Sequence, residues 1–513
     1  MKRFDLAIVG SGFGGSLLAL VARRLGRTVV LIEKGTHPRF AIGESTSPLA
    51  NLLVERIARR YDLPEVAPLA KWGTWQARLP RVRGGIKRGF TFFHHREGRE
   101  PVSDPALRNP LLVAASPRDE IADTHWYRAD VDHFLLERAR AAGAEYVDRV
   151  VLDGFEREDR GVRLSGASNG DRVAFEARCV ADASGPRGFL HRALRLGERP
   201  FAAMPATRAL YSHFRGVARM DDAARGDETP PYPIDDAALH HVFDGGWIWV
   251  LRFEGGITSA GAMLSPELDR EIRGGEGEPA WRRLLAMFPA VARQFRHAAP
   301  LLPFRYDEGV PFRSAAASGP GWWMLPSAAA FVDPLLSTGI PLTLLGIARA
   351  GLALEDSPEG DGFERRIGEV AARTLDEADL TAELVSALWR SFDDFETFGA
   401  ATMFYFAAAS FSEASCRLGR EELPGFIGAD RPALRAAIRR ASARLRGETA
   451  DRAGFSDAAR AAIEPWNVAG FLDPARRNWY PVSAADLRAA APKLGASAGE
   501  IDRLLERTGF ETG

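Results

Sequence analysis

Glycines close to the N-terminus have the spacing of a loop that binds a dinucleotide. They lie in the sequence Gly-Ser-Gly-Phe-Gly-Gly at residues 10–15. Gly10 permits a tight turn, Gly12 lets backbone N–H groups approach a pyrophosphate, and Gly15 lets a helix pack closely on a sheet. Glu33 follows at the distance at which an acidic residue accepts hydrogen bonds from a ribose. These residues predict dinucleotide binding; the alternative is a tight turn that binds nothing.

The segments around these glycines predict the elements that would position them. Residues 4–9 form an apolar, β-branched run that is typical of a buried strand, and residues 28–32 form a second one. Residues 16–25 have helical character and are followed by Gly26, where a helix would stop. The partial positive charge at the start of this helix would face the phosphates. Strand, glycine turn, helix, strand and acidic residue in this order are more specific than the glycines alone.

Two later stretches predict further helix starts. Residues 43–48 hold serine, threonine and proline ahead of an apolar run, which predicts either a capped helix beside the bound dinucleotide or an ordinary capped helix. Residues 321–346 predict a strand, a loop with Asp333 and Pro334, and a helix from about Gly339. Free N–H groups at the start of that helix would form a second anion site.

Other residues would have a chemical role only if the fold places them well. Lys87 lies in residues 84–95, whose alternation predicts a strand, and most lysines on strands are solvated edge residues. Arg128 stands just before an expected helix and would contact the cofactor or form a surface ion pair. Trp247 and Trp249 share one face of an expected strand, either in the core or on the wall of a cavity.

Length and composition narrow the class of protein. The chain has 513 residues, more than one core holds, so we expect two or three packed units. A formal net charge of -1 favours neither nucleic acid nor an anionic membrane as a partner. The sequence has two cysteines, no metal-site spacing and no apolar run long enough to cross a membrane. We therefore expect a protein of the reducing cytoplasm.

The order of the expected elements predicts an α/β protein with three regions. Residues 1–200 and 305–355 would form a discontinuous, Rossmann-like nucleotide-binding domain, and residues 201–304 an inserted, mostly antiparallel β-rich substrate domain. Residues 356–513 are alanine-rich and predict a helical C-terminal region, with a helix over residues 362–397. The sequence has no second glycine motif, so a dedicated nicotinamide domain is not expected.

Several stretches, taken together, resemble the two-component flavin-dependent halogenases, and within them the branch that acts on phenols and other small aromatics. They recur in the order of that family and cover roughly the first 350 residues, whereas the C-terminal helices match only in general character. The resemblance implies an FAD-binding fold of the glutathione reductase and para-hydroxybenzoate hydroxylase type. The matching stretches are residues 10–15, 37–40 with 43–46, 84–92, 246–250 and 331–339.

The resemblance also implies the ligands and the residues that hold them. FAD would arrive in reduced form from a separate flavin reductase, chloride or bromide would bind beside it, and no metal is expected. The residues that would hold FAD are Gly10, Gly12, Phe13, Gly14, Gly15, Glu33, Lys34, Ser45, Thr46, Arg128, Asp333, Pro334, Gly339 and Ile340. The remaining assignments are Thr338 and Gly339 for the halide, Lys87 as the catalytic lysine, and Trp247, Trp249, Phe90 and Phe92 for the substrate cavity.

The implied reaction is halogenation of an electron-rich compound of the phenol or indole type. Reduced FAD and O₂ would form a flavin hydroperoxide, and attack by the halide would yield hypohalous acid. Lys87 would guide this oxidant to the arene through a hydrogen bond or as a chloramine, because burial leaves part of a lysine uncharged. The candidates for a general base, none of them preferred, are His94, His95, His213, His240 and His241.

Departures from the family pattern and a shared fold leave alternatives. Leu251 and Arg252 stand where the WxWxIP signature has isoleucine and proline, which would alter the wall between flavin and substrate. Leu336 replaces a glutamate of the tryptophan halogenases, which argues against free tryptophan as the substrate. The alternatives are an FAD-dependent monooxygenase or a geranylgeranyl-reductase-like oxidoreductase without halide use, and an inactive flavin-binding homologue. A homodimer is left open.

Overall fold

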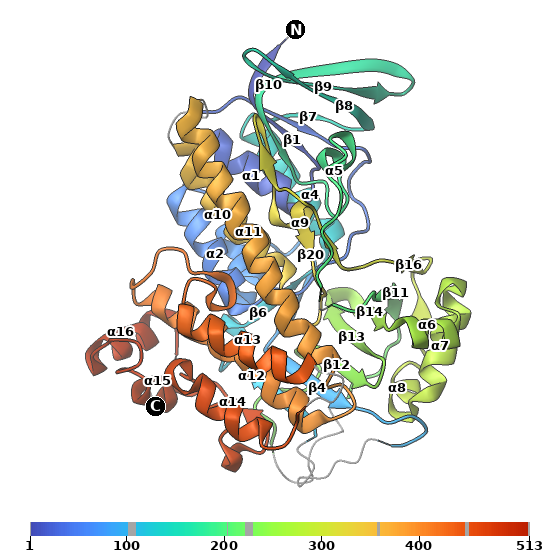
Figure 1. Cartoon of the computed structure of the whole chain (residues 1–513), viewed down its shortest axis with the longest axis vertical. Helices are drawn as coiled ribbons and strands as arrows, with labels where there is room; N and C mark the ends of the chain where they lie inside the picture. The colour runs from blue at the N-terminus through green and yellow to red at the C-terminus, as the bar shows by residue number, and fades with distance from the viewer. Residues whose placement is uncertain are drawn as a thin grey trace.

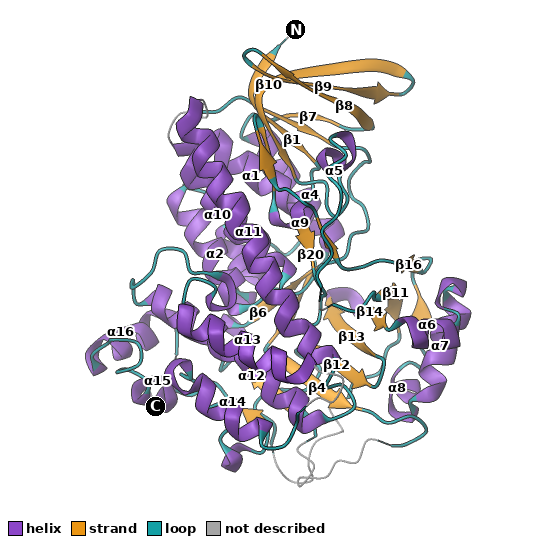
Figure 2. Cartoon of the chain, viewed as in Figure 1, coloured by secondary structure: helices purple, strands orange, loops and turns teal. Residues whose placement is uncertain are grey.

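The computed structural model describes residues 2–100, 109–202, 204–220, 229–355, 360–446 and 451–510. Figure 1 shows one sheet beside the N-terminus, a second sheet in the opposite half of the molecule, and long helices along one side. Figure 2 shows that most of the C-terminal half is helical. Within the described residues, no helix combines the length and the apolar character needed to span a membrane.

The first sheet contains the predicted strand–helix–strand unit. β1 (Arg3–Val9), α1 (Phe13–Arg24) and β2 (Val29–Ile32) follow one another, and all four residues of β2 are buried, as expected for a covered parallel strand. The strand order is β18-β19-β10-β1-β2-β7, parallel from β19 to β7, and a hairpin of β8 and β9 extends from β10. The other bounds are β7 (Glu145–Val147), β8 (Val150–Glu158), β9 (Gly161–Ser168), β10 (Asp171–Asp182), β18 (Ser318–Gly319) and β19 (Trp322–Met324).

The turn between β1 and α1 requires two of the predicted glycines. Gly10 has a φ of 97°, which favours glycine. A Cβ on Gly15 would lie 1.9 Å from the carbonyl oxygen of Gly10, so α1 begins in direct contact with the turn. The first turn of α1 itself contains no acidic residue, so apart from the Asp132 carboxylate, which binds the N–H of Phe13, its positive end can face an anion.

The second sheet is mostly antiparallel and draws on three regions of the chain. Its order is β15-β11-β14-β13-β12-β4-β5-β21, with β16 beside β11. β4, β5, β16 and β21 lie outside residues 201–304, so this sheet does not stop at the boundaries expected for an inserted domain. The bounds are β4 (Gly89–His94), β5 (Leu111–Ala114), β11 (Arg208–Arg215), β12 (Ala238–Phe243), β13 (Gly246–Phe253), β14 (Ile257–Leu264), β15 (Ala299–Pro300), β16 (Arg305–Asp307) and β21 (Trp479–Tyr480).

The two faces of this sheet pack differently. One face packs on α6 (Pro266–Ile272), α7 (Glu278–Met287) and α8 (Pro289–Gln294) in a core of its own. The other face, which carries Trp247 and Trp249, belongs to the large core shared with the first sheet and the C-terminal helices. Both tryptophans therefore point toward the middle of the protein and not to solvent.

A short ribbon buries Lys87 beneath the second sheet. β3 (Gly84–Lys87) pairs antiparallel with β6 (Asp123–Trp126), and the register sets Lys87 opposite the first residue of β6. A Cβ on Gly85 would lie 1.9 Å from the carbonyl oxygen of Arg252 in β13. The absence of a side chain at Gly85, two residues before Lys87, thus allows the ribbon to contact the sheet directly.

The C-terminal region is helical as predicted, but its first helix is shorter than expected. α11 (Gly360–Trp389) ends early, and α12 (Phe395–Arg417) begins as a separate helix. The Asp394 carboxylate accepts hydrogen bonds from the first N–H groups of α12 and so acts as its N-cap. The prediction of one helix over residues 362–397 is therefore wrong.

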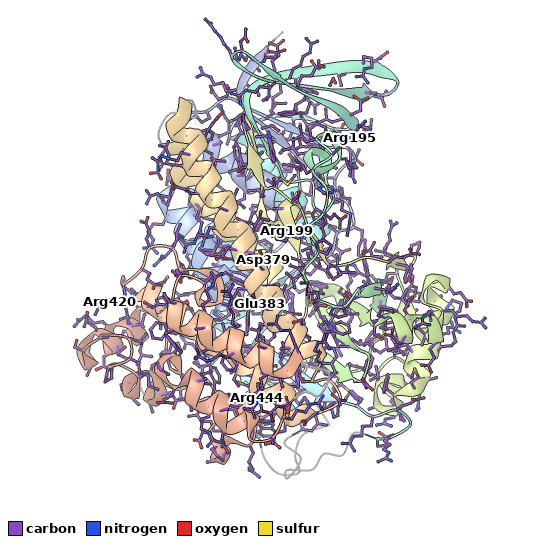
Figure 3. All side chains as sticks on the ribbon, in the orientation of Figure 1. Arg195, Arg199, Asp379, Glu383, Arg420 and Arg444 are labelled. Carbon is purple, nitrogen blue, oxygen red and sulfur yellow. The ribbon has the colours of Figure 1, made fainter. Side chains whose placement is uncertain are left out.

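Buried and half-buried ion pairs fix α11 to two neighbouring segments. The Arg313 guanidinium donates to both oxygens of Asp379, at 2.8 and 3.0 Å, and Figure 3 labels Asp379 on this helix. Arg349 of α10 (Gly339–Glu355) binds both oxygens of Glu377 at 2.7 Å. The remaining elements are α2 (Pro48–Arg60), α3 (Trp72–Arg78), α4 (Arg128–Ala141), α5 (Phe189–Ala193), α9 (Pro326–Ala329), α13 (Pro432–Arg446), α14 (Phe455–Ile463), α15 (Ala484–Ala489), α16 (Ala498–Thr508), β17 (Phe312–Arg313) and β20 (Ala330–Phe331).

Candidate active site

A cleft of about 640 Å³, which we call the glycine-loop cleft, lies beside the turn between β1 and α1. The N-termini of α1 and α10 both border it, and its volume is typical of a ligand site. The predicted cofactor residues that line it are Gly12, Phe13, Gly14, Arg128, Gly339 and Ile340. Thr338, predicted for the halide, lines the same cleft.

Glu33 and Lys34 lie behind the glycine turn and do not line the cleft. The buried Glu33 carboxylate accepts hydrogen bonds from the N–H and the hydroxyl of Ser11, both at 2.9 Å. Burial would raise the pKa of Glu33, but these hydrogen bonds and the nearby Arg39 guanidinium hold it below its usual value. Lys34 is exposed. In this structure Glu33 therefore orders the glycine turn, while its contact with a ribose stays a prediction.

Arg128 links the start of α1 to α4. Its guanidinium donates to both oxygens of Asp132, at 2.7 and 2.9 Å, and to the carbonyl oxygens of Ile42 and Gly43, at 2.7 and 3.0 Å. Asp132 also accepts a hydrogen bond from the N–H of Phe13 at 3.2 Å. Arg128 is buried, so the expected alternative of a surface ion pair is wrong.

A second cavity, of about 120 Å³, adjoins the cleft, and we call it the tryptophan chamber. Trp247 and Trp249 line it together with Ser45 and Pro334. Residues 338–340 line both the chamber and the cleft. The start of α10 therefore forms part of the wall between these two spaces.

The loop that leads into α10 is held in an uncommon conformation. Ser337 has a φ of 54°, which is rare for residues other than glycine and is typical of functional loops. The Asp333 carboxylate does not line the cleft; it accepts hydrogen bonds from the backbone two residues on, at 2.9 Å, and from the Trp389 indole, at 3.1 Å. Burial raises the pKa of Asp333 to about 7. Among the described residues, the N–H groups of Thr338 and Gly339 have no hydrogen-bond acceptor.

Lys87 is completely buried, with 0% of its surface exposed. Its ammonium donates hydrogen bonds to the hydroxyl of Ser45 at 2.9 Å, the carbonyl of Thr46 at 2.6 Å and the hydroxyl of Ser337 at 3.3 Å. Its Nζ also lies 3.7 Å from the ring centre of Phe90. Lys87 is therefore not a solvated edge lysine, and two of its partners line the tryptophan chamber.

A third cavity, of about 170 Å³, lies on the Phe90 side of Lys87, and we call it the helical cavity. Phe90 and Asp123 line it, while Tyr405 comes from α12 and Leu505 from α16. Lys87 thus contacts residues of two different cavities, the tryptophan chamber through its hydroxyl partners and the helical cavity through Phe90.

The four residues predicted for the substrate cavity do not share one cavity. Trp247 and Trp249 line the tryptophan chamber, and Phe90 lines the helical cavity. Phe92 lines neither of them; its ring stacks on His240, with ring centres 4.6 Å apart, inside the core. The structure therefore separates the predicted set into two groups, one on each side of Lys87.

Sequence reasoning assigned no role to several residues that line these spaces. Asn51, Asp123 and Tyr405 line the helical cavity, and Arg39 and Arg187 line the glycine-loop cleft. Arg39 lies in a stretch that matches the family, residues 37–40, and the other four lie in none of those stretches. The position of Asp123, for example, follows from strand pairing that the local pattern does not reveal.

Burial changes the ionisation of the groups around Lys87. It lowers the pKa of Lys87 to about 7 and raises the pKa of Asp123 to about 8, since the charged form of each is poorly solvated. Within the described residues, these two side chains form no ion pair. Burial also lowers the pKa of His240, on the chamber wall, to about 3, so this imidazole is neutral.

Arg252, which replaces the proline of the WxWxIP signature, does not line the tryptophan chamber. Arg252 donates to the Asp235 carboxylate at 2.5 Å and to the carbonyl oxygen of Val217 at 3.0 Å. Leu251 supplies the apolar surface of the chamber instead. The concern that Arg252 alters this wall is therefore not supported by the geometry.

Comparison with known proteins identifies the class of the fold first. The family model of the NAD(P)-binding Rossmann-like domain matches residues 8–61. Among solved structures, that of halogenase PltM in complex with phloroglucinol and FAD superposes with a TM-score of 0.81 and 24% sequence identity. This match covers 92% of the present chain and 99% of PltM, so the two chains share the whole fold.

Curated relatives identify the family. The chain is 31% identical over 416 residues to monodechloroaminopyrrolnitrin halogenase PrnC from Pseudomonas fluorescens, a match that covers 78% of this chain and 70% of the relative. It is also 31% identical over 353 residues to tetracycline 7-halogenase from Kitasatospora aureofaciens, covering 67% of this chain and 61% of that protein. The chain therefore belongs to the flavin-dependent halogenases and is an enzyme of that family.

The burial of Lys87 predicts how stability depends on pH. A lysine in the unfolded chain titrates near 10.5 and Lys87 in the folded chain near 7, so between these values the unfolded chain holds the extra proton. A rise in pH therefore favours folding. We therefore expect the difference in the free energy of unfolding between wild type and Lys87→Met, measured in urea, to rise as the pH is raised from 7 to 10.5. Loss of the lysine charge would raise the pKa of Asp123 further and acts in the same direction. A difference that stays constant over this range would contradict the assignment.

Proposed function

We propose that this halogenase uses FAD, received in reduced form from a separate flavin reductase, to chlorinate or brominate a small aromatic compound of the phenol or indole class. The observation that carries the proposal is the complete burial of Lys87 between the tryptophan chamber and the helical cavity. Such a partition suits halogen transfer, because an arene in direct contact with the flavin would meet activated oxygen and be hydroxylated.

The glycine-loop cleft fits FAD. The start of α1 offers the backbone N–H groups of Gly12 and Gly14, and the buried Arg128, which is paired with Asp132, lines the same cleft. The crystallised complex of PltM with FAD supports the choice of this flavin. When bound, reduced FAD supplies the activation of O₂ that oxidation of a halide needs.

The start of α10 offers the halide a site in the wall between the cleft and the tryptophan chamber. The N–H groups of Thr338 and Gly339 have no acceptor among the described residues, and the first turn of α10 has no acidic residue. Amides at a helix N-terminus attract an anion without the tight hold of a neighbouring positive side chain. A halide there would be held beside the flavin and released readily as it reacts.

In this proposal Lys87 controls where the oxidised halogen goes. Hypohalous acid formed near α10 would reach the hydroxyls of Ser45 and Ser337, which bind the lysine ammonium. Because its pKa lies near 7, Lys87 can donate a proton or offer a free amine at neutral pH. We place the arene in the helical cavity, where Phe90 provides an aromatic wall within 3.7 Å of the lysine nitrogen.

The names of relatives support an aromatic substrate. They include a tetracycline 7-halogenase, a tryptophan 2-halogenase and a brominase of a pyrrole-2-carbonyl group on a carrier protein. Leu336 is completely buried and stands where the tryptophan halogenases have a glutamate. Free tryptophan is therefore the less favoured substrate within this class. The cytoplasmic location, the homodimer and the three-domain division stay predictions.

Replacement of Lys87 by alanine is expected to remove halogenation while FAD binding remains. Enzyme, flavin reductase, FAD, bromide and a panel of phenols and indoles are combined, and products are identified by mass spectrometry. Product should fall by roughly 10²–10⁴-fold, the usual effect of losing a positioned proton donor. Lys2→Ala, which changes an exposed lysine paired with Glu145, is the matched control and should keep the wild-type rate. Equal product from Lys87→Ala, or hydroxylated arene alone from wild type, would sink the proposal.

Substitution of Gly339 separates the halide site from the flavin site. Gly339→Pro removes one N–H at the first helical position, a position at which proline is common in helices. Gly339→Ala keeps that N–H and has room, because the nearest atom to an added Cβ lies 3.9 Å away. We expect the proline variant alone to raise the bromide concentration for half-maximal rate, by roughly 10-fold for a lost hydrogen bond to an anion. If FAD affinity, measured by fluorescence, falls as much as bromide use, the amide does not hold the halide.

A further inference from the structure

Two acceptor oxygens in the helical cavity are buried without a hydrogen-bond donor. Asp123 is 3% exposed, and one of its carboxylate oxygens accepts a hydrogen bond from the Asn51 amide at 2.5 Å. Among the described residues, the second Asp123 oxygen, Oδ2, and the amide oxygen of Asn51 have no partner. Both side chains line the helical cavity. Leaving buried acceptors unsatisfied costs free energy, so a donor supplied by a ligand in this cavity would be favoured.

Neighbouring groups of the protein do not supply that donor. The ammonium of Lys87 is committed to Ser45, Thr46 and Ser337, although Lys87 stands opposite Asp123 in the ribbon. At the α12 side of the cavity, Arg417 is held by Glu413 and Glu55, at 2.7 and 3.0 Å. Asp123 therefore remains, among the described residues of this cavity, a carboxylate without a cationic partner.

We propose that Asp123 binds the O–H or ring N–H donor of the arene and thereby orients the ring toward Lys87. This inference rests on the proposed function, and it names the substrate class more closely: arenes that carry a hydrogen-bond donor on or next to the reacting ring. A hydrogen bond from a phenol to a carboxylate also enriches the ring in electrons at the positions beside the oxygen, where an electrophilic halogen adds. Asn51 fixes the carboxylate, and its own free oxygen suits a second donor, as in a 1,3-dihydroxybenzene.

The geometry explains why this carboxyl is close enough to matter. Lys87 ends β3 and Asp123 begins β6, and the two residues are paired across the ribbon. The Phe90 ring contacts the lysine nitrogen, and Phe90 lines the same cavity as Asp123. An arene packed on Phe90 would thus have the acceptor on one side and the halogen-guiding lysine on the other. Burial raises the pKa of Asp123 to about 8, so the carboxyl is mostly protonated at neutral pH before an arene binds. A donor from the arene would stabilise the carboxylate form and so lower this pKa.

The test uses pairs of arenes that differ only in the donor. Resorcinol is compared with 1,3-dimethoxybenzene, and indole with 1-methylindole, using the full chain, reduced FAD and bromide. Wild type should favour the donor-bearing member of each pair. Asp123→Asn should lower kcat/KM for that member about 10–100-fold, the effect expected for a hydrogen bond to a charged group. The same Asp123→Asn substitution should change kcat/KM for the methylated arene of each pair by less than twofold. Asp153→Asn, at an exposed aspartate of β8, is the matched control and should behave as wild type.

A trapping assay separates this inference from the proposed function. The enzyme is run without arene, and monochlorodimedone captures any hypohalous acid that is formed. Retention of trapped oxidant in Asp123→Asn shows that the flavin and halide sites are intact. An equal loss on both members of each pair, no loss on either, or no preference of wild type for the donor would overturn the role of Asp123. If wild type forms no trapped oxidant and no halogenated arene, the proposed function itself fails.

Discussion

The structure depends on one buried cation, the ammonium of Lys87, and on the three oxygen atoms that accept its hydrogen bonds. Removing a charge from water is costly, which lowers the pKa of Lys87 to about 7, and hydrogen bonds to the ammonium offset only part of that cost. Here the acceptors come from the segment before α2 and the loop before α10, while β3 carries the lysine. Three separate parts of the chain thus meet at one nitrogen. The contact of Gly85 with β13 keeps the ribbon close enough for this meeting.

The loop before α10 joins that cation to the rest of the site. Ser337 contacts the lysine, while residues 338–340 line both the glycine-loop cleft and the tryptophan chamber. A hydrogen bond from the Trp389 indole to the Asp333 carboxylate fixes the start of this loop to α11. A change in the loop would therefore affect the proposed halide site, the wall and the lysine together. This coupling gives a physical reason for the strained backbone at Ser337.

Local patterns in the sequence predict the first βαβ unit, the start of α10 and the tryptophan pair well, because each depends on neighbours along the chain. They do not predict the burial of Lys87, which depends on a hydrogen bond to Ser337, 250 residues away in sequence. The roles of Asp123 and Asn51 were missed for the same reason, since strand register and helix packing bring them together. Arg252 shows the converse: its identity departs from the family signature, yet its side chain points to Asp235, away from the chamber.

The central claim is that a buried lysine separates the place where halide is oxidised from the place where the arene is held. A crystal structure of the enzyme soaked with FAD, bromide and resorcinol tests it directly, because bromide is located by its anomalous scattering. The account predicts flavin in the glycine-loop cleft, a bromide peak at the N–H groups of Thr338 and Gly339, and the arene in the helical cavity with Lys87 in between. An arene stacked against the flavin in one continuous space, or a Lys87 nitrogen open to bulk water, would contradict it.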